Sequence, residues 1–482
     1  MNEERSVVSM KKKTTIIILM IMVFVLFAVA GTIIFYLNYE NTNNNPKNKT
    51  QTFADVTDVE EFQMIPLYDA KGVKITEPVD RGDNVYMVTV NGTDKGQYET
   101  YLKTLKDAGY EFFADNGSEG IDQTVFTASF TKNELTVTVT YVGKEETVYI
   151  TSSKKMELSP HLIDKEEYRS NMIDGMNNTL HMLELYDYGN SFLIQLKNGH
   201  FIVNDGGSSN DIKYLIDYME KLAPNGEKPV IEAWIITHAH GDHNGALAAM
   251  AADTTLLNRI YIDGIYISTP SDAELNAVNA MMLKTNMMMI QSLPSFAKAS
   301  DGTSTKVYRP QMGQKYYFCD VVMDVMHTQE QLCKEDYANM DINDSSTWTM
   351  FHIDGQKFLH SGDADKGSMG IVLRTYSQEY LDMDIYASFH HNLNNWLPFL
   401  EYSRIKTTLF TSNTTEAQNK VAGELNSIGS NAWLKENSLE YYSWEDGGKV
   451  LTFPYKVGTA ETLPMQEWIY HENRTQTFSK GE

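Results

Sequence analysis

Thr237-His238-Ala239-His240-Gly241-Asp242-His243-Asn244-Gly245 is the most informative segment of the chain. It follows the apolar, strand-like segment Val230 to Ile236 and precedes the helix-like segment Ala246 to Ala252. Imidazole and carboxylate groups are ligands of zinc and similar divalent ions. In an extended turn the first two histidines can share one ion, while the Asp-His pair reaches a second. Because the chain has only 12 histidines in 482 residues, a chance cluster is the less favoured explanation.

The pattern H-x-H-x-D-H resembles the signature of the metallo-β-lactamase-fold hydrolases. Further motifs extend the resemblance, namely Asn343-Asp344-Ser345-Ser346, Gly362-Asp363 and His390-His391. This set is similar to one branch of the family, which includes the hydrolase domain of the bacterial DNA-uptake competence channel and the secreted phosphorylcholine esterases. The branch pattern is H-x-H-x-D-H-x-G, N-D-x-S, G-D and H-H-G, and this chain departs from it at Asn392, which replaces the last glycine.

The resemblance implies a centre of two divalent ions, expected to be Zn²⁺ with Mn²⁺ or Fe²⁺ as alternatives. The implied metal ligands are His238, His240, Asp242, His243, His327, Asp363 and His391. Asp363 is implied to bridge both ions, because a shared anion offsets the repulsion between two close cations. The implied catalytic residues are Asp242 and His390, and the implied substrate contacts are Asn343, Ser346 and His390. A D-G-G turn, here at Asp205, is expected beside the metals.

Two assignments within this set stay open. The third ligand of the first ion is expected from a strand end, which favours His327 over His352 and His360. A first ion without a third protein ligand is the remaining alternative. The paired histidines are also ambiguous, and we expect His391 to bind metal and His390 to contact the substrate.

The N-terminus predicts a membrane anchor. Residues 16–37 form an uncharged, mostly apolar segment that is long enough to cross a bilayer as a helix. Lys11 to Lys13 precede it and predict that residues 1–15 are cytoplasmic, which leaves the remainder outside the cell. A cleaved signal peptide ending near Ala28-Val29-Ala30 is the alternative. Residues 38–52 are rich in asparagine and are expected to be a flexible linker.

Residues 53–157 predict a small α+β domain with the order β-α-β-β-β. Alternating valine and threonine in Leu135 to Val142 predicts a half-exposed strand. No group of histidines, cysteines or paired carboxylates falls in this domain, so we interpret it as a spacer or recognition module. Residues 158–174 are the expected connection to the next domain.

Residues 175–457 predict a layered α/β domain, and the family resemblance implies a hydrolase with an αββα sandwich. Strands are expected over Lys315 to Met326 and a closing hairpin over Leu439 to Phe453. Ser271 to Ser295 predicts a methionine-rich helix, for which core packing is the favoured role over an apolar lip at the site. Residues 458–482 are an expected polar tail.

The composition of the chain makes some classes of binding partner less favoured. The net charge of −24 disfavours nucleic acid, because phosphate binding depends on lysine and arginine. Two cysteines, Cys319 and Cys333, are too few for a disulfide framework, and one bridge or two free thiols are equally compatible with their spacing.

These observations predict a membrane-anchored, extracellular hydrolase that uses a water activated by two metals, on a phosphodiester or phosphoester substrate. An exported nuclease of the competence type and a non-catalytic metal-binding surface protein are the alternatives. The oligomeric state does not follow from the sequence.

Overall fold

The computed structural model describes residues 51–464, except 56, 83, 155, 187–188, 269, 272–280, 333–341, 412–424 and 445–446. The expected anchor over residues 16–37 lies outside this described part, as do residues 1–15, the linker up to residue 50, and residues 465–482 of the tail. Among the described helices, none has both the length and the apolar character needed to cross a membrane.

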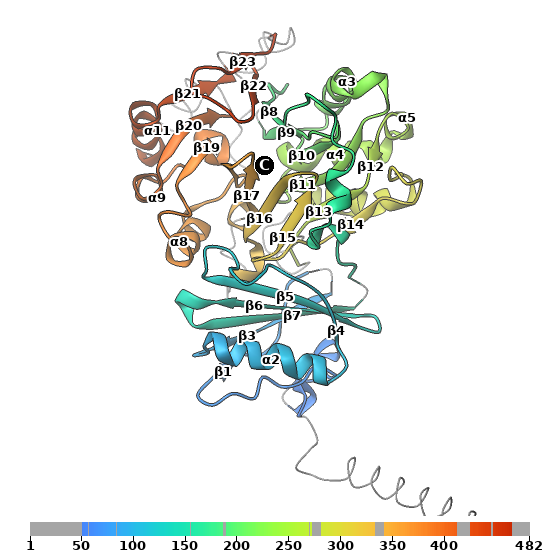
Figure 1. Cartoon of the computed structure of the whole chain (residues 1–482), viewed down its shortest axis with the longest axis vertical. Helices are drawn as coiled ribbons and strands as arrows, with labels where there is room; N and C mark the ends of the chain where they lie inside the picture. The colour runs from blue at the N-terminus through green and yellow to red at the C-terminus, as the bar shows by residue number, and fades with distance from the viewer. Residues whose placement is uncertain are drawn as a thin grey trace, which may run out of the picture.

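The first unit is one antiparallel sheet with a helix on one face (Figure 1). Its strand order is β1-β3-β7-β6-β5-β4, and β2 pairs with β3. The helix α2 begins with a capping box at Asp94 and buries Tyr98, Tyr101 and Leu105 against the sheet. The elements are β1 (Lys74–Ile75), β2 (Val79–Asp80), β3 (Val85–Asn91), α2 (Lys95–Asp107), β4 (Glu111–Asp115), β5 (Val125–Lys132), β6 (Leu135–Val142) and β7 (Thr147–Lys154).

The threonine face of β6 is buried, so the prediction of a half-exposed strand was wrong. Thr138 is only 1% exposed. The reason is a loop from the second unit, which lies across this face and offers the carbonyl of Met312 to the hydroxyls of Thr127 and Thr140, at 3.1 Å and 3.2 Å. The sequence alternation correctly separates the two faces, but it does not show that another segment covers the polar one.

The second unit contains two further sheets. One has the order β14-β13-β11-β10-β9-β8-β22-β23, with β12 beside β11. Its strands are β8 (Thr179–Met182), β9 (Ser191–Gln195), β10 (Phe201–Asp205), β11 (Val230–Ile236), β12 (Tyr261–Ile262), β13 (Gly264–Ile267), β14 (Lys306–Tyr308), β22 (Lys449–Thr452) and β23 (Glu461–Thr462). The other runs from β15 to β21 in chain order. Its strands are β15 (Lys315–Phe318), β16 (Val321–His327), β17 (Trp348–Ile353), β18 (Gln356–His360), β19 (Met383–Ala387), β20 (Ile405–Phe410) and β21 (Glu440–Ser443).

Alternation along the strands builds four layers. Phe351 and Phe358 face the first of the two sheets and join its Phe192 in one core, whereas Trp348 and Leu359 face the opposite way. Four of the described helices pack against the sheet that contains Phe192. They are α3 (Ile212–Leu222), α4 (Gly241–Ala252), α5 (Thr254–Leu257) and α7 (Met281–Ser292). The helices on the outer side of the other sheet are α8 (Lys366–Thr375), α9 (Leu397–Tyr402) and α11 (Leu425–Asn437). Figure 1 shows these two groups of helices on opposite sides, in agreement with the expected αββα sandwich.

The structure bears on four local expectations and contradicts one of them, the closing hairpin. The strands expected over residues 315–326 are β15 and β16, which form a hairpin that turns at Cys319 and Asp320. The expected closing hairpin is absent from the described residues, because β21 pairs with β20 while β22 pairs with β8 in the other sheet. The described part of the expected methionine-rich helix is α7 (Met281–Ser292), and residues 272–280 lie outside the described residues. Cys319 is a buried free thiol, and Cys333 lies outside the described residues.

Candidate metal centre

The H-x-H-x-D-H segment occupies the turn between β11 and α4. His238 and His240 follow the buried strand β11, and the carbonyl of His240 accepts the amide N–H of Asn244 at 3.0 Å as the helix begins. Asp242 and His243 lie in the first turn of α4, where a carboxylate is favoured by the helix dipole. The expected helix over residues 246–252 therefore begins five residues earlier, which places two of the predicted ligands on it.

His238, His240 and Asp363 form a first cluster. One nitrogen or oxygen from each residue lies within 4.8 Å of the others. His238 Nε2 is 3.0 Å from His240 Nδ1 and 3.8 Å from Asp363 Oδ2. The two imidazoles thus present different ring nitrogens to one point.

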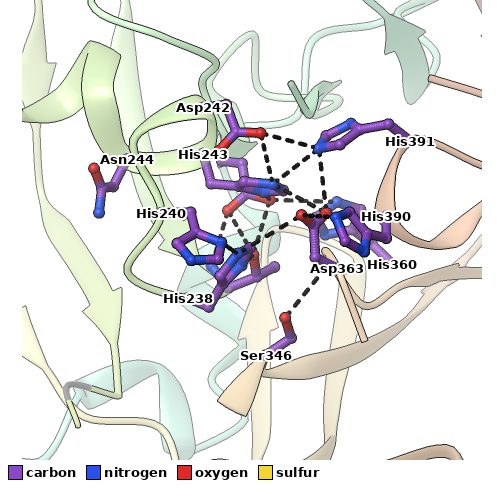
Figure 2. A network of polar contacts seen from close by, with 12 residues as sticks. His238, His240, Asp242, His243, Asn244, Ser346, His360, Asp363, His390 and His391 are labelled. Carbon is purple, nitrogen blue, oxygen red and sulfur yellow. Dashed lines mark hydrogen bonds and ion pairs between the residues drawn. The ribbon is translucent and has the colours of Figure 1, made fainter. Parts of the chain in front are cut away.

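Asp242, His243, Asp363 and His391 form a second cluster beside the first (Figure 2). His243 Nε2 is 3.0 Å from Asp363 Oδ1. His391 Nε2 is 3.3 Å from the same oxygen and 3.1 Å from Asp242 Oδ2. These four side chains come from α4, from the turn after β18 and from the turn after β19.

Asp363 belongs to both clusters and divides its oxygens between them. Oδ1 faces His243 and His391, whereas Oδ2 faces His238 and, at 3.5 Å, His390. The preceding Gly362 has a φ of +54°, and an added Cβ there would lie 2.3 Å from the Thr237 hydroxyl. Glycine therefore allows the close approach that brings the Asp363 carboxylate between the two clusters.

Three consecutive residues with positive φ present the paired histidines. The φ angles of His390, His391 and Asn392 are 47°, 48° and 72°. Asn392 stands where the branch pattern H-H-G has glycine, and asparagine is among the few other residues that adopt this region readily. Asparagine is therefore compatible with the positive φ at this position, and Asn431 Nδ2 donates a hydrogen bond to the Asn392 carbonyl at 2.8 Å.

Residues 186–393 match the family described as the metallo-beta-lactamase superfamily, and this range contains both clusters. They form a metallo-β-lactamase superfamily domain. Members of this superfamily are typically hydrolases and usually bind divalent metals.

Similar solved structures are distant in sequence. Zn²⁺-bound PqqB from Methylobacterium extorquens is 13% identical with a TM-score of 0.25, over 41% of this chain and 58% of its own. A metallo-β-lactamase with a HARLDQ motif from Cronobacter sakazakii is 13% identical with a TM-score of 0.25, over 52% and 91%. The metallo-β-lactamase of Hirschia baltica is 12% identical with a TM-score of 0.20, over 61% and 71%. The chain thus spans 58% of the length of PqqB. No curated protein matches the sequence significantly.

Behind the clusters of the metallo-β-lactamase domain lies Asp205, the first residue of the D-G-G turn. Its Oδ2 is 2.8 Å from His243 Nδ1, and both of its oxygens are 3.0 Å from the Thr237 hydroxyl. Because that hydroxyl donates to Asp205, its oxygen is left to accept from His238 Nδ1, 3.1 Å away. Asp205 therefore fixes the tautomers of His243 and His238, and each keeps Nε2 for an ion. The turn was only a weak signal in the sequence, and Thr237 was not predicted to act.

The N-D-S-S motif supports Asp363, the residue expected to bridge the two ions. Ser346 is fully buried, and its hydroxyl accepts the amide N–H of Asp363 at 3.3 Å. Asp344 accepts the amide N–H of Ser368 at 3.0 Å in the first turn of α8. Ser346 therefore positions Asp363 and is not accessible to a substrate, contrary to the prediction. Asn343 is half-buried, and its substrate contact stays a prediction.

His327 is the one predicted ligand that belongs to neither cluster. It pairs across the sheet with Trp348, whose side chain lies on the α8 side, and paired residues of neighbouring strands share a face. Burial lowers the pKa of His327 to about 4, against the opposing effect of Glu330. His360 pairs with Thr349 and faces the centre, with Nε2 3.6 Å from Asp205 Oδ2, but it too is outside both clusters. His352 is bound to Asp324 at 2.9 Å.

The donor chemistry fits two divalent ions. The first cluster offers two imidazoles and a carboxylate oxygen, and the second offers two imidazoles and two carboxylates. Burial acts to raise the pKa of Asp363, but His243, His390 and His391 hold it well below its usual range. Burial and the neighbouring His243 keep the pKa of His238 well below its usual value, so this ring is neutral, as a ligand must be.

Proposed function

We propose that the chain is a membrane-anchored, extracellular hydrolase that requires two divalent metal ions and acts on a phosphodiester or phosphoester. The observation that carries the proposal is the division of the Asp363 oxygens between two clusters of imidazole ligands. The apolar segment at residues 16–37, with lysines before it, supports the anchor and the orientation. Zn²⁺ is the preferred ion because imidazoles dominate both clusters.

The residues of the two clusters would bind the ions as follows. His238 and His240 would hold the first ion, Asp242, His243 and His391 the second, and Asp363 both. When bound, such a pair of ions lowers the pKa of a water between them and stabilises negative charge on the substrate. The side chain of Asp242 is 21% exposed, and it would orient that water as well as ligate the second ion.

His390 is the residue best placed to touch the substrate. Its side chain is 23% exposed, whereas that of its neighbour His391 is 3% exposed. Its Nε2 lies 3.5 Å from Asp363 Oδ2, and an imidazole N–H there can donate a hydrogen bond to a phosphoryl oxygen. This placement favours an oxyanion substrate and supports the assignment of His391, not His390, to the metal.

Purified full-length protein in detergent would test the reaction. Bound metal would be measured, and the protein would be screened with bis(p-nitrophenyl) phosphate, p-nitrophenyl phosphate, p-nitrophenyl phosphorylcholine, linear DNA and a chromogenic cephalosporin. Since metal ligation supplies several kcal/mol to such a reaction, Asp242→Ala and His240→Ala should each lower turnover by about 10³-fold. His352→Ala is the matched control, because this histidine binds Asp324 away from both clusters.

The outcomes separate the alternatives. Turnover that survives both substitutions would discard the two-metal site as the active site. Cleavage of DNA in preference to small esters would favour the nuclease. Metal binding without turnover on any compound would favour a non-catalytic surface protein. Protease treatment of intact cells tests the location, and a domain that stays protected would contradict export.

A further inference from the structure

The first unit makes a buried, charged contact with the metallo-β-lactamase domain. Arg309 and Glu330 form an ion pair at 2.8 Å, and their side chains are only 5% and 1% exposed. Burial acts to raise the pKa of Glu330, but Arg309 and Thr328 hold it below its ordinary value. A buried ion pair is stable only when its remaining donors and acceptors are also satisfied. The residues that bind those remaining atoms therefore determine which segments of the fold the ion pair connects.

Other donors of Arg309 bind the first unit. They bind the carbonyl of Arg81 and, at 3.3 Å, the carbonyl of Gly82, in the turn between β2 and β3. Gln329 also donates to the Arg81 carbonyl at 3.3 Å, and Arg81 Nη1 donates to the carbonyl of Leu332 at 3.5 Å. This turn thus lies between Arg309 and the segment that follows β16.

The acceptors of Glu330 connect the pair to both sheets of the sandwich. Ser268 donates its hydroxyl to Glu330 at 3.2 Å. Ser268 directly follows β13, and its neighbour Ile267 is paired with Ile236, the residue before Thr237. Glu330 itself follows the end of β16. One carboxylate therefore joins strand ends that belong to different sheets.

The ends of β13 and β16 both lie near Thr237, which contacts His238 of the first cluster. On the side of β16, His327 pairs with Trp348, and the preceding Thr347 donates its amide N–H to the carbonyl of Thr237 at 2.8 Å. On the side of β13, the parallel pairing with β11 ends next to Thr237. Thr237 in turn contacts His238 and Asp205. A shift of either strand end would thus reach the metal ligands through Thr237.

We propose that the first unit positions the metal centre, and that Arg309 and Glu330 are positioning residues through which the turn at Arg81 and Gly82 holds the ends of β13 and β16. The first unit is then a part of the hydrolase and not a spacer. The kinetic part of this inference rests on the proposed function, whereas the metal-binding part does not.

The test separates positioning from stability with a double substitution. In full-length protein, Arg309→Met alone leaves Glu330 buried without its partner, so both the melting temperature and kcat/KM for bis(p-nitrophenyl) phosphate should fall. Adding Glu330→Met replaces the pair by apolar side chains, which should restore the melting temperature. The link to the turn at Arg81 stays broken, so we expect kcat/KM to remain about tenfold low, a loss within the range for supporting residues.

Co²⁺ binding gives a readout that is independent of turnover. The double variant should bind Co²⁺ more weakly, with an altered visible absorption spectrum. Arg374→Ala is the matched control, since its ion pair with Glu145 at 2.7 Å also joins the two units but is 57% exposed on the arginine side. This control should retain the wild-type spectrum. A double variant with wild-type kcat/KM, Co²⁺ affinity and spectrum would overturn the inference. If the wild type hydrolyses nothing, the Co²⁺ comparison still decides it.

Discussion

Asp205 Oδ2 lies 2.8 Å from His243 Nδ1, in a buried position behind both clusters of the metallo-β-lactamase domain. The opposite nitrogen of His243 is 3.0 Å from Asp363 Oδ1, so the ring connects a supporting carboxylate to the predicted bridging one. Asp205 has a φ of 58°, and the amide N–H of Thr237 donates to it at 2.8 Å. The turn therefore holds the carboxylate in a fixed orientation, and the carboxylate holds the imidazole.

Asp205→Ala should weaken metal binding without removing a ligand. Without the Asp205 carboxylate, the proton of His243 is no longer fixed on Nδ1. Through Thr237, the same holds for the proton of His238. Removal of such a partner typically lowers metal affinity by about 10- to 100-fold. Asp205→Asn should have a smaller effect, because its amide oxygen can still accept from His243. Competition with a chelator would measure the affinities.

Asp301→Ala controls for the loss of a carboxylate, because Asp301 accepts from Thr303 in an exposed turn far along the chain from the clusters. Equal affinities for Asp205→Ala and this control would show that the tautomers are fixed by something else.

Six of the seven metal ligands that the family resemblance implies lie in the two clusters. Val230 to Ile236 is observed as β11 with the expected bounds, and the segment after it carries four of the clustered side chains. Asp363 and His391 are far away in sequence, yet their strand ends lie at the same edge of the sandwich. The family resemblance named these two residues, and the hydrophobic runs before them predicted the strands that they follow, β18 and β19.

Contacts between distant segments caused the errors. His327 does end a strand, as expected, but an irregularity between Val325 and His327 changes which face it occupies. Alternation counted from the sequence cannot detect such a shift. Ser346 and the threonines of β6 are polar and were expected to be accessible, whereas Asp363 and the loop at Met312 cover them. From sequence alone, a buried polar residue that hydrogen-bonds to a distant segment cannot be distinguished from one that is exposed to solvent.

His327→Ala should leave the metal content unchanged. The ring is buried on the α8 side, so its removal creates a cavity away from the clusters, and the free energy of unfolding should fall by about 1–3 kcal/mol. His391→Ala should instead lower the metal content by one ion at limiting concentration. Metal analysis and chemical denaturation of both variants would check this. Loss of one ion in His327→Ala would restore this histidine as the third ligand.

Gly362→Ala should disrupt the predicted bridge more than an ordinary glycine substitution does. A Cβ at this position would lie 2.3 Å from the Thr237 hydroxyl, so Asp363 would have to move. Gly355→Ala is the matched control, because Gly355 also has a positive φ of 79° but no atom within 4 Å of an added Cβ. Both variants should lose about 1–2 kcal/mol from backbone strain, but only Gly362→Ala should lose metal affinity. Similar affinities in the two variants would contradict the argument.

Metal affinity should rise with pH between about 6.5 and 9. Burial acts to lower the pKa of His391, but Asp363 and Asp242 raise it from 6.5 to about 9 in the metal-free arrangement. Below pH 9 an ion must therefore displace the proton from this ring, and each displaced proton makes the affinity about tenfold stronger per pH unit. His243, whose pKa is also raised well above its usual value, adds to the slope.

The stability of the metal-free protein should change in the opposite direction over the same range. A raised pKa means that the folded state holds the His391 proton more tightly, so this contribution is complete below the unfolded value of 6.5 and is lost as the pH passes about 9. Chelator competition and denaturation at pH 6, 7, 8 and 9 would measure both trends. His391→Ala should make both trends shallower and leave the part that His243 contributes, whereas His352→Ala should leave both unchanged, since His352 binds Asp324 outside the clusters. An affinity that is constant across this range would mean that the clustered imidazoles are already neutral, and that the carboxylates of Asp242 and Asp363 do not hold protons on them.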